Sequence, residues 1–217
     1  ADGPVIQAAA QRALERGTTI EDVMAVAEGI RRSSRIPLVA FSYLNPILKF
    51  GEERFAQRAR AAGFDGVLVT DLPPEAAAPF CGTLRANQLD PVFLVAPTST
   101  PERIRLADRL SRGFVYCVST SGVTGARRAL DPALLGRLDA LRPAVKNPIA
   151  VGFGVAAHEQ YRELAGRCDA VVVGSAIVRA IGEGEESGAA ERAAAVVREI
   201  LGRGVANEGR AEGALRA

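Results

Sequence analysis

Short apolar runs alternate with amphipathic stretches along almost the whole chain. Strands buried in a parallel sheet are typically short continuous apolar runs. In the stretches between them, apolar residues recur at the period of a helix with one apolar face. This alternation predicts a parallel α/β fold. The six expected strands are Ile36 to Tyr43, Gly66 to Asp71, Pro91 to Ala96, Phe114 to Ser119, Pro148 to Phe153 and Ala170 to Gly174.

Glycine loops follow the last two of these runs, at Gly152-Phe153-Gly154 and at Gly174-Ser175. A plausible helix follows each loop, so backbone N–H groups at a helix N-terminus can bind a phosphate group. Two such loops on neighbouring strands match the usual phosphate site of a TIM (β/α)8 barrel, after strands 7 and 8. The sequence therefore predicts an α/β fold of this class, incomplete, with about six of eight strands and truncated at its N-terminus.

The expected domain covers residues 1–201, as strands 3 to 8 of such a barrel. Residues 202–217 are rich in Gly, Ala and charge and are expected to form a flexible C-terminal tail. Local sequence signals also predict where helices begin and end. Thr18 with Glu21 predicts a capping box, Gly63 a helix end, and Thr100 before Pro101 a helix start.

Composition excludes several classes of function. The 217 residues carry a net charge of +2, and acidic and basic residues are intermixed. This distribution predicts no strong positive potential that would attract nucleic acid or a membrane surface. Three separate cysteines indicate reduced thiols and a cytoplasmic protein. The only histidine, His158, excludes His-rich metal sites and makes Ser-His or Cys-His chemistry improbable, so acid–base catalysis rests on carboxylates, tyrosine or lysine. No metal site and no cofactor are expected on this chain.

Further motifs occur in a specific order and spacing. They are Ala1-Asp2-Gly3-Pro4-Val5-Ile6-Gln7, Tyr43-Leu44-Asn45-Pro46, Thr70-Asp71-Leu72-Pro73, Ser121-Gly122-Val123-Thr124-Gly125, Gly152-Phe153-Gly154 and Gly174-Ser175-Ala176-Ile177-Val178. This set resembles the α subunit of tryptophan synthase, from the first residue to about Leu201. The opening heptad and the Ser-Gly-Val-Thr-Gly segment are its specific parts.

The resemblance implies aldol cleavage of indole-3-glycerol phosphate to indole and glyceraldehyde 3-phosphate. A carboxylate that accepts a hydrogen bond from the indole N–H stabilises the positive charge that develops on the ring, and a second carboxyl group transfers protons. By resemblance the first carboxylate is Asp2; alone, an Asp-Gly-Pro would be read as a turn. The family's proton-transferring glutamate lies upstream of Ala1, so the activity of this chain itself is doubtful.

The other implied site residues fall into two groups. The phosphate-binding residues are Gly125, Phe153, Gly154, Gly174 and Ser175, although glycines also serve tight turns. The pocket and lid residues are Ile6, Tyr43, Tyr116 and Thr124, where core packing is the alternative for the two tyrosines. Thr124 belongs to a polar segment, residues 119–130, that would close over the barrel mouth.

The implied partner is a tryptophan synthase β subunit in an α2β2 heterotetramer, which would carry pyridoxal phosphate. Two alternatives stay open at this point. One is another phosphate-binding barrel enzyme of the phosphosugar isomerase type. The other is a catalytically incomplete allosteric partner of a β subunit, suggested by the unmatched glutamate.

Overall fold

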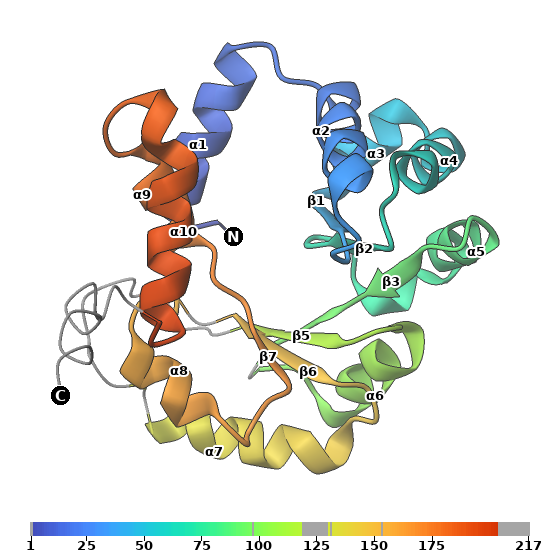
Figure 1. Ribbon diagram of the computed structural model, residues 1–217. Coiled ribbons are helices and arrows are strands. Elements are labelled where there is room, and N and C mark those ends of the chain that lie inside the picture. Colours follow the sequence, from blue (N-terminus) through green and yellow to red (C-terminus); the bar gives the residue numbers. More distant parts are fainter. Residues whose placement is uncertain (1, 97, 119–129, 131, 153, 204–217) are drawn as a thin grey trace, which may run out of the picture.

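The computed structural model describes residues 2–96, 98–118, 130, 132–152 and 154–203 (Figure 1). The helices are α1 (Pro4–Glu15), α2 (Ile20–Ser33), α3 (Leu44–Phe50), α4 (Glu52–Ala62), α5 (Ala78–Ala86), α6 (Pro101–Leu110), α7 (Pro132–Leu141), α8 (His158–Leu164), α9 (Ser175–Gly182) and α10 (Ala189–Ile200), with 3-10 turns η1 (Pro74–Ala76), η2 (Arg142–Ala144) and η3 (Glu186–Gly188). The strands are β1 (Val39–Ser42), β2 (Gly66–Val69), β3 (Asp90–Val92), β4 (Leu94–Val95), β5 (Val115–Val118), β6 (Ile149–Gly152) and β7 (Ala170–Val171).

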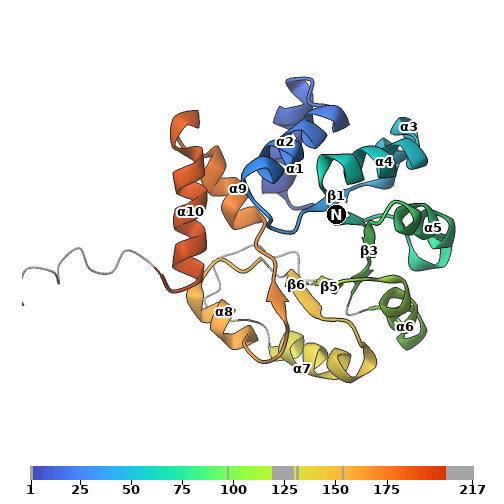
Figure 2. The same ribbon diagram turned by 45° about the vertical axis from the view of Figure 1, so that its right-hand side comes forward.

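All strand pairs in this part of the chain are parallel. They run in the order β1-β2-β3 in one sheet and β4-β5-β6-β7 in the other. Figures 1 and 2 show the strands inside a ring of helices, the arrangement of a (β/α) barrel. Five expected strands are confirmed in shortened form. The third expected strand, Pro91 to Ala96, is divided at Phe93, whose N–H donates to the Ser111 hydroxyl at 3.0 Å.

The start of α2 corrects one prediction. Thr19, not Thr18, is the N-cap residue: its hydroxyl accepts from the Asp22 N–H, and the Asp22 carboxylate accepts the Thr19 N–H at 2.8 Å. Glu21 instead pairs with Arg54 and with a second arginine of α4. The Thr-Asp pair wins because Thr19 is in extended backbone, the conformation that an N-cap requires. The other helix signals are confirmed, with Gly63 left-handed (φ +93°) after α4 and Thr100 capping α6.

Two apolar clusters fill the space between strands and helices. One joins α2, α4 and α5 to β1 and β2, around Met24, Phe55 and Val67. The other joins α6, α7, α8 and α10 to the second sheet, around Ile149 and Leu164. Leu72 packs against both clusters, so they meet beyond the end of β2.

Aspartates fix the amino-terminal ends of the strands. The Asp65 carboxylate, just before β2, accepts the Leu38 N–H at 2.8 Å. The Asp169 carboxylate, just before β7, accepts the Ile149 N–H at 2.8 Å. In a barrel this end serves stability, which leaves the carboxyl ends for a ligand.

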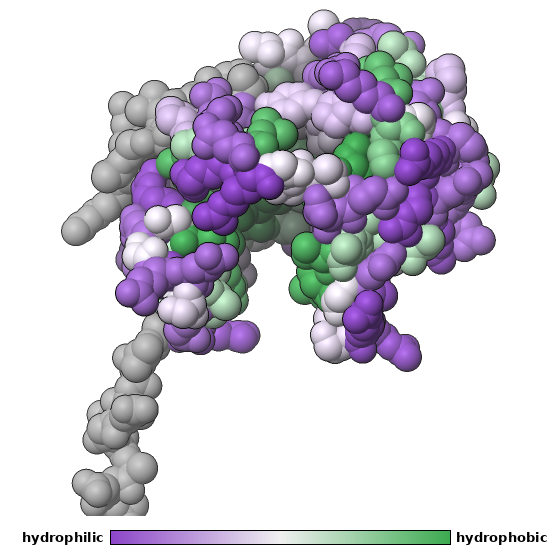
Figure 3. Space-filling view, turned by 90° about the horizontal axis from the view of Figure 1, so that it is seen from above, coloured by the Kyte–Doolittle hydropathy of each residue, from purple (hydrophilic) through white to green (hydrophobic). Residues whose placement is uncertain are grey.

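Helix α1, near the start of the chain, packs against α9, which comes late in the sequence (Figure 1). Seen from above, the molecule is hollowed between two arms, with hydrophobic surface on the inner walls (Figure 3). Among the helices described, none is long and apolar enough to cross a membrane. Of the expected tail, residues 204–217 lie outside the described residues.

Candidate active site

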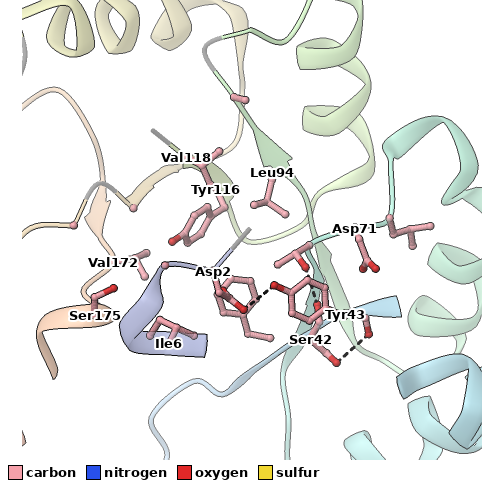
Figure 4. Close-up of a pocket in the computed structure, with 18 of the residues that line it drawn as sticks. Asp2, Ile6, Ser42, Tyr43, Asp71, Leu94, Tyr116, Val118, Val172 and Ser175 are labelled. Atoms are coloured by element: carbon pink, nitrogen blue, oxygen red, sulfur yellow. Dashed lines mark hydrogen bonds between the residues drawn. The ribbon is translucent and has the colours of Figure 1, made fainter. Parts of the chain in front are cut away.

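A cavity of about 1010 Å³ opens at the carboxyl ends of the strands (Figure 4). The packing of α1 on α9 brings the start of the chain to this cavity, next to the loops that follow β6 and β7. Seven residues predicted from the sequence line it together: Asp2, Ile6, Tyr43, Tyr116, Gly154, Gly174 and Ser175. Three others, Thr124, Gly125 and Phe153, lie outside the described residues.

The Asp2 side chain forms a hydrogen bond with a tyrosine from across the cavity. The Tyr43 hydroxyl donates to Asp2 Oδ2 at 2.7 Å (Figure 4). This hydrogen bond raises the pKa of Tyr43, and burial and the negative charge of Asp2 add to the effect. The phenol therefore stays protonated and remains a donor. Within the part of the chain that the structure describes, no other side chain hydrogen-bonds the Asp2 carboxylate.

Another part of the cavity lining is backbone at the start of α9. Gly174 is the N-cap residue and has no side-chain cap, and Ser175 begins the helix. The first N–H groups of a helix have no intrahelical acceptor, and the helix dipole favours an anion beside them. Both residues line the cavity, so these N–H groups and the Ser175 hydroxyl are positioned for an anionic ligand (Figure 4).

The two loop glycines differ in what the fold alone demands. Gly154 has φ +66°, a conformation that L side chains rarely adopt, so the turn itself explains this glycine. Gly174 has φ −112°, and a Cβ built there would meet nothing within 4 Å. Neither backbone strain nor packing requires glycine at position 174.

Aromatic side chains also line the cavity. The rings of Phe41 and Tyr116 lie 6.0 Å apart between centroids, inclined at 40°. Tyr116 lies over Gly152, where an added Cβ would come within 2.0 Å of the tyrosine oxygen. Burial raises the pKa of Tyr116, which is consistent with a ring enclosed by apolar neighbours. With Ile6 from α1, these residues suit a planar apolar group.

The cavity also contains residues that sequence reasoning did not single out. Arg103 on α6 lines it and binds Glu75 through two hydrogen bonds, Nε to Oε1 at 2.8 Å and Nη2 to Oε2 at 3.2 Å. Ser99 lines it as well. In the sequence, Arg103 occupies a position in the helical pattern of α6 that is typical of a solvated surface residue. Its partner is 28 positions away, so no local signal could have identified the contact.

The remaining candidate groups are structural in this part of the chain. No group of three or more His, Cys, Asp or Glu side chains among the described residues could hold a metal ion. Burial raises the pKa of the Cys117 thiol to about 11, and the three cysteines are free thiols. His158 begins α8, and its Nδ1 lies 3.0 Å from the Ile200 carbonyl oxygen, which links α8 to α10.

Comparisons with known proteins agree on one family. The model of the tryptophan synthase alpha chain family matches residues 1–204. The alpha chain of Solibacter usitatus is 49% identical over 191 residues, which are 88% of this chain and 72% of the relative. That of Geobacter sulfurreducens is 47% identical over 82% of this chain and 68% of the relative. In a tryptophan synthase complex from Pyrococcus furiosus, one chain superposes with a TM-score of 0.85 at 36% identity, covering 93% of this chain and 81% of that one.

Proposed function

This chain belongs to the tryptophan synthase alpha chain family and is a lyase of tryptophan biosynthesis, and from that premise we propose how its cavity works. The substrate is indole-3-glycerol phosphate, cleaved to indole and glyceraldehyde 3-phosphate. One observation supports this most strongly: the same cavity is lined by the Asp2 carboxylate and by the uncapped backbone of Gly174-Ser175. The first suits an N–H donor and the second suits a phosphate group.

The bond changes of this reaction balance without a redox step. A proton adds to C3 of the indole, and the ring nitrogen becomes positively charged. The hydroxyl on the adjacent carbon then loses its proton and becomes the aldehyde carbonyl. The electron pair of the C3–glycerol bond returns to the ring as that bond breaks. In this proposal Asp2 Oδ1 accepts the indole N–H and stabilises the charged intermediate, as electrostatic complementarity requires.

The other lining residues receive roles from their positions. Tyr43 holds Asp2 Oδ2, while Tyr116, Phe41 and Ile6 enclose the indole ring. The phosphate is bound by N–H groups at Gly154, Gly174 and Ser175, and by the Ser175 hydroxyl. By resemblance, Gly125 and Phe153 complete the phosphate site and Thr124 belongs to a lid. We assign residues 1–201 to one barrel domain.

The proposal extends to partners and location. A solved relative from Pyrococcus furiosus is described as an α2β2 complex. We assign the same kind of β subunit to this chain as its partner, with pyridoxal phosphate bound there and no cofactor bound here. The assigned compartment is the cytoplasm, in keeping with three free cysteines.

A second candidate function is activation of the β subunit without cleavage. The observation that favours it concerns the other carboxylate that lines the described cavity, Asp71, which accepts the Leu44 N–H at 2.7 Å. That oxygen is occupied, so Asp71 is poorly placed to transfer protons to the substrate. Turnover of the β subunit, measured with and without the full chain in the absence of indole-3-glycerol phosphate, tests this function. The family match removes the isomerase alternative.

The phosphate site is tested by Gly174→Ala. A methyl group there extends into open space in the free protein, so the free energy of unfolding should change by less than about 1 kcal/mol. The same methyl would occupy the position of a bound phosphate. We expect the affinity for indole-3-propanol phosphate, which has no hydroxyl and is not cleaved, to fall at least about tenfold, or about 1.4 kcal/mol. Isothermal titration calorimetry measures it.

Gly82→Ala is the matched control. Gly82 lies on α5, and a Cβ there also meets nothing within 4 Å, but the residue does not line the cavity. Its affinity for the same ligand should equal that of the unmodified chain. Equal affinities in both variants would remove the phosphate assignment at Gly174.

A further inference from the structure

We propose that Asp71 is a positioning residue for the Asp2 carboxylate, acting through the first turn of α3 and the Tyr43 phenol. The inference rests on the proposed role of Asp2. It assigns a function to a carboxylate that lines the cavity and that the chemistry above does not use.

The first step is the contact between Asp71 and α3. Asp71 Oδ1 accepts the N–H of Leu44, the first residue of that helix, at 2.7 Å. Tyr43 is the N-cap residue and makes no side-chain cap of its own. A helix N-terminus needs acceptors for its first N–H groups, and a negative charge there is favourable. Asp71 supplies both from the neighbouring strand connection.

The second step is the effect on Tyr43. The cap keeps α3 beginning at Leu44, so Tyr43 stays in extended backbone, with φ −92° and ψ 161°. The Ser42 hydroxyl donates to the Tyr43 carbonyl oxygen at 3.0 Å, and the Thr70 N–H donates to the Ser42 carbonyl oxygen at 3.0 Å. These contacts fix the ends of β1 and β2 together, and the ring of Tyr43 points into the cavity (Figure 4).

The third step is the transmission to Asp2. The Tyr43 hydroxyl donates to Asp2 Oδ2 at 2.7 Å, so the direction of the phenol sets the orientation of that carboxylate. The negative charge of Asp71 also contributes to the raised pKa of Tyr43, after the larger effects of Asp2 and burial. Asp71 therefore favours both the position and the protonated form of the donor. A shift of about 1 Å at a reacting group is enough to lower a rate about a hundredfold.

This chain of contacts makes a prediction that simple loop support does not. If Asp71 acts through Tyr43, its removal should have no further effect once the phenol hydroxyl is gone. In the full chain, Asp71→Ala should lower kcat for cleavage about 10- to 100-fold, with KM changed less than about threefold because the proposed phosphate-binding residues are unchanged. Tyr43→Phe should lower kcat by a similar factor. The double variant should be no slower than Tyr43→Phe.

Two further variants separate position from folding. Asp71→Asn keeps an oxygen acceptor for the Leu44 N–H, so kcat should recover to within about threefold of the unmodified chain. Leu44→Pro removes the donor, but its fixed φ also sets the start of a helix and keeps the preceding residue extended, so kcat should stay within about threefold of the unmodified chain. Asp71→Ala combined with Leu44→Pro should then recover most of the kcat lost in Asp71→Ala, because the N–H that needed an acceptor is gone.

Asp22→Ala is the matched control. Asp22 also caps a helix from its carboxylate, at α2, but it does not line the cavity. It should reduce thermal stability without altering kcat. If the effects of Asp71→Ala and Tyr43→Phe on kcat multiply in the double variant, or if kcat is unchanged in Asp71→Ala, the inference is overturned. Asp2→Asn, assayed alongside, keeps the two levels apart: an unchanged kcat there would overturn the role of Asp2 itself.

Discussion

Replacing Asp2 by asparagine should lower kcat for cleavage of indole-3-glycerol phosphate about 10²- to 10⁴-fold in the full chain. The asparagine amide has nearly the same shape, and its oxygen can still accept a hydrogen bond from the Tyr43 hydroxyl. It has no negative charge, so it cannot balance the positive charge that develops on the indole ring. Stopped-flow or steady-state measurement of indole release gives kcat and KM separately.

The affinity for an uncleaved ligand should change much less than kcat in Asp2→Asn. In the proposed site, binding depends mainly on Gly174-Ser175 and on the aromatic side chains, and these are untouched. We expect the dissociation constant of indole-3-propanol phosphate to rise less than about tenfold, the value of one ordinary hydrogen bond. Loss of binding together with kcat would instead indicate that Asp2 serves the structure of the cavity.

Asp108→Ala should cause a large loss of stability, about 2 to 4 kcal/mol. Asp108 is only 7% exposed, and its Oδ1 accepts the N–H groups of Lys146 and Asn147 at 3.0 Å each. The Asn147 side chain donates to the same oxygen at 2.9 Å. Alanine would leave the backbone N–H groups of Lys146 and Asn147 without this acceptor just before β6, although the Asn147 side chain would keep its bond to the carbonyl oxygen of residue 108 at 2.8 Å.

The stability that Asp108 contributes should also depend on pH. Burial opposes its charge, but hydrogen bonds from Asn147 and Lys146 hold the pKa of this carboxyl below its ordinary value of 3.8. A carboxyl group with a lowered pKa stabilises the fold above its unfolded value, and the effect is lost as the pH falls through the folded value. The difference between Asp108→Ala and the unmodified chain should therefore be constant near pH 7 and shrink below about pH 4.

Urea unfolding at pH 7 and at pH 3 measures both effects. Asp139→Ala is a control, because the exposed Asp139 carboxylate pairs only with the exposed Arg167 among the described residues. Surface pairs of this kind contribute at most about 1 kcal/mol. A loss below 1 kcal/mol in Asp108→Ala at pH 7 would contradict the account of the β6 anchor.

The parallel strands and most helix ends could be predicted from the sequence because their signals are local. Apolar runs, Gly63 after α4 and Thr100 before Pro101 each act within a few residues. The error at Thr18 arose because two threonines adjoin two acidic residues, and only the backbone conformation at Thr19 selects the pair. The division of the third strand at Phe93 depends on Ser111, 18 positions away, which no local pattern reveals.

The same limit applies to the candidate site. Asp2, Tyr43 and Ser175 were predicted from motifs that resemble a known family, and the structure brings them to one cavity. Their roles stay predictions. The Arg103–Glu75 pair and the Asp71–Leu44 contact were not predicted, because each joins residues 27 or 28 positions apart through tertiary packing.

A crystal structure of the chain with indole-3-propanol phosphate bound tests the central claim most directly. The account predicts phosphate oxygens within hydrogen-bond distance of the N–H groups at Gly174 and Ser175, and the indole nitrogen within about 3 Å of Asp2 Oδ1. A ligand bound with its phosphate elsewhere, or with the indole nitrogen directed away from Asp2, would contradict it.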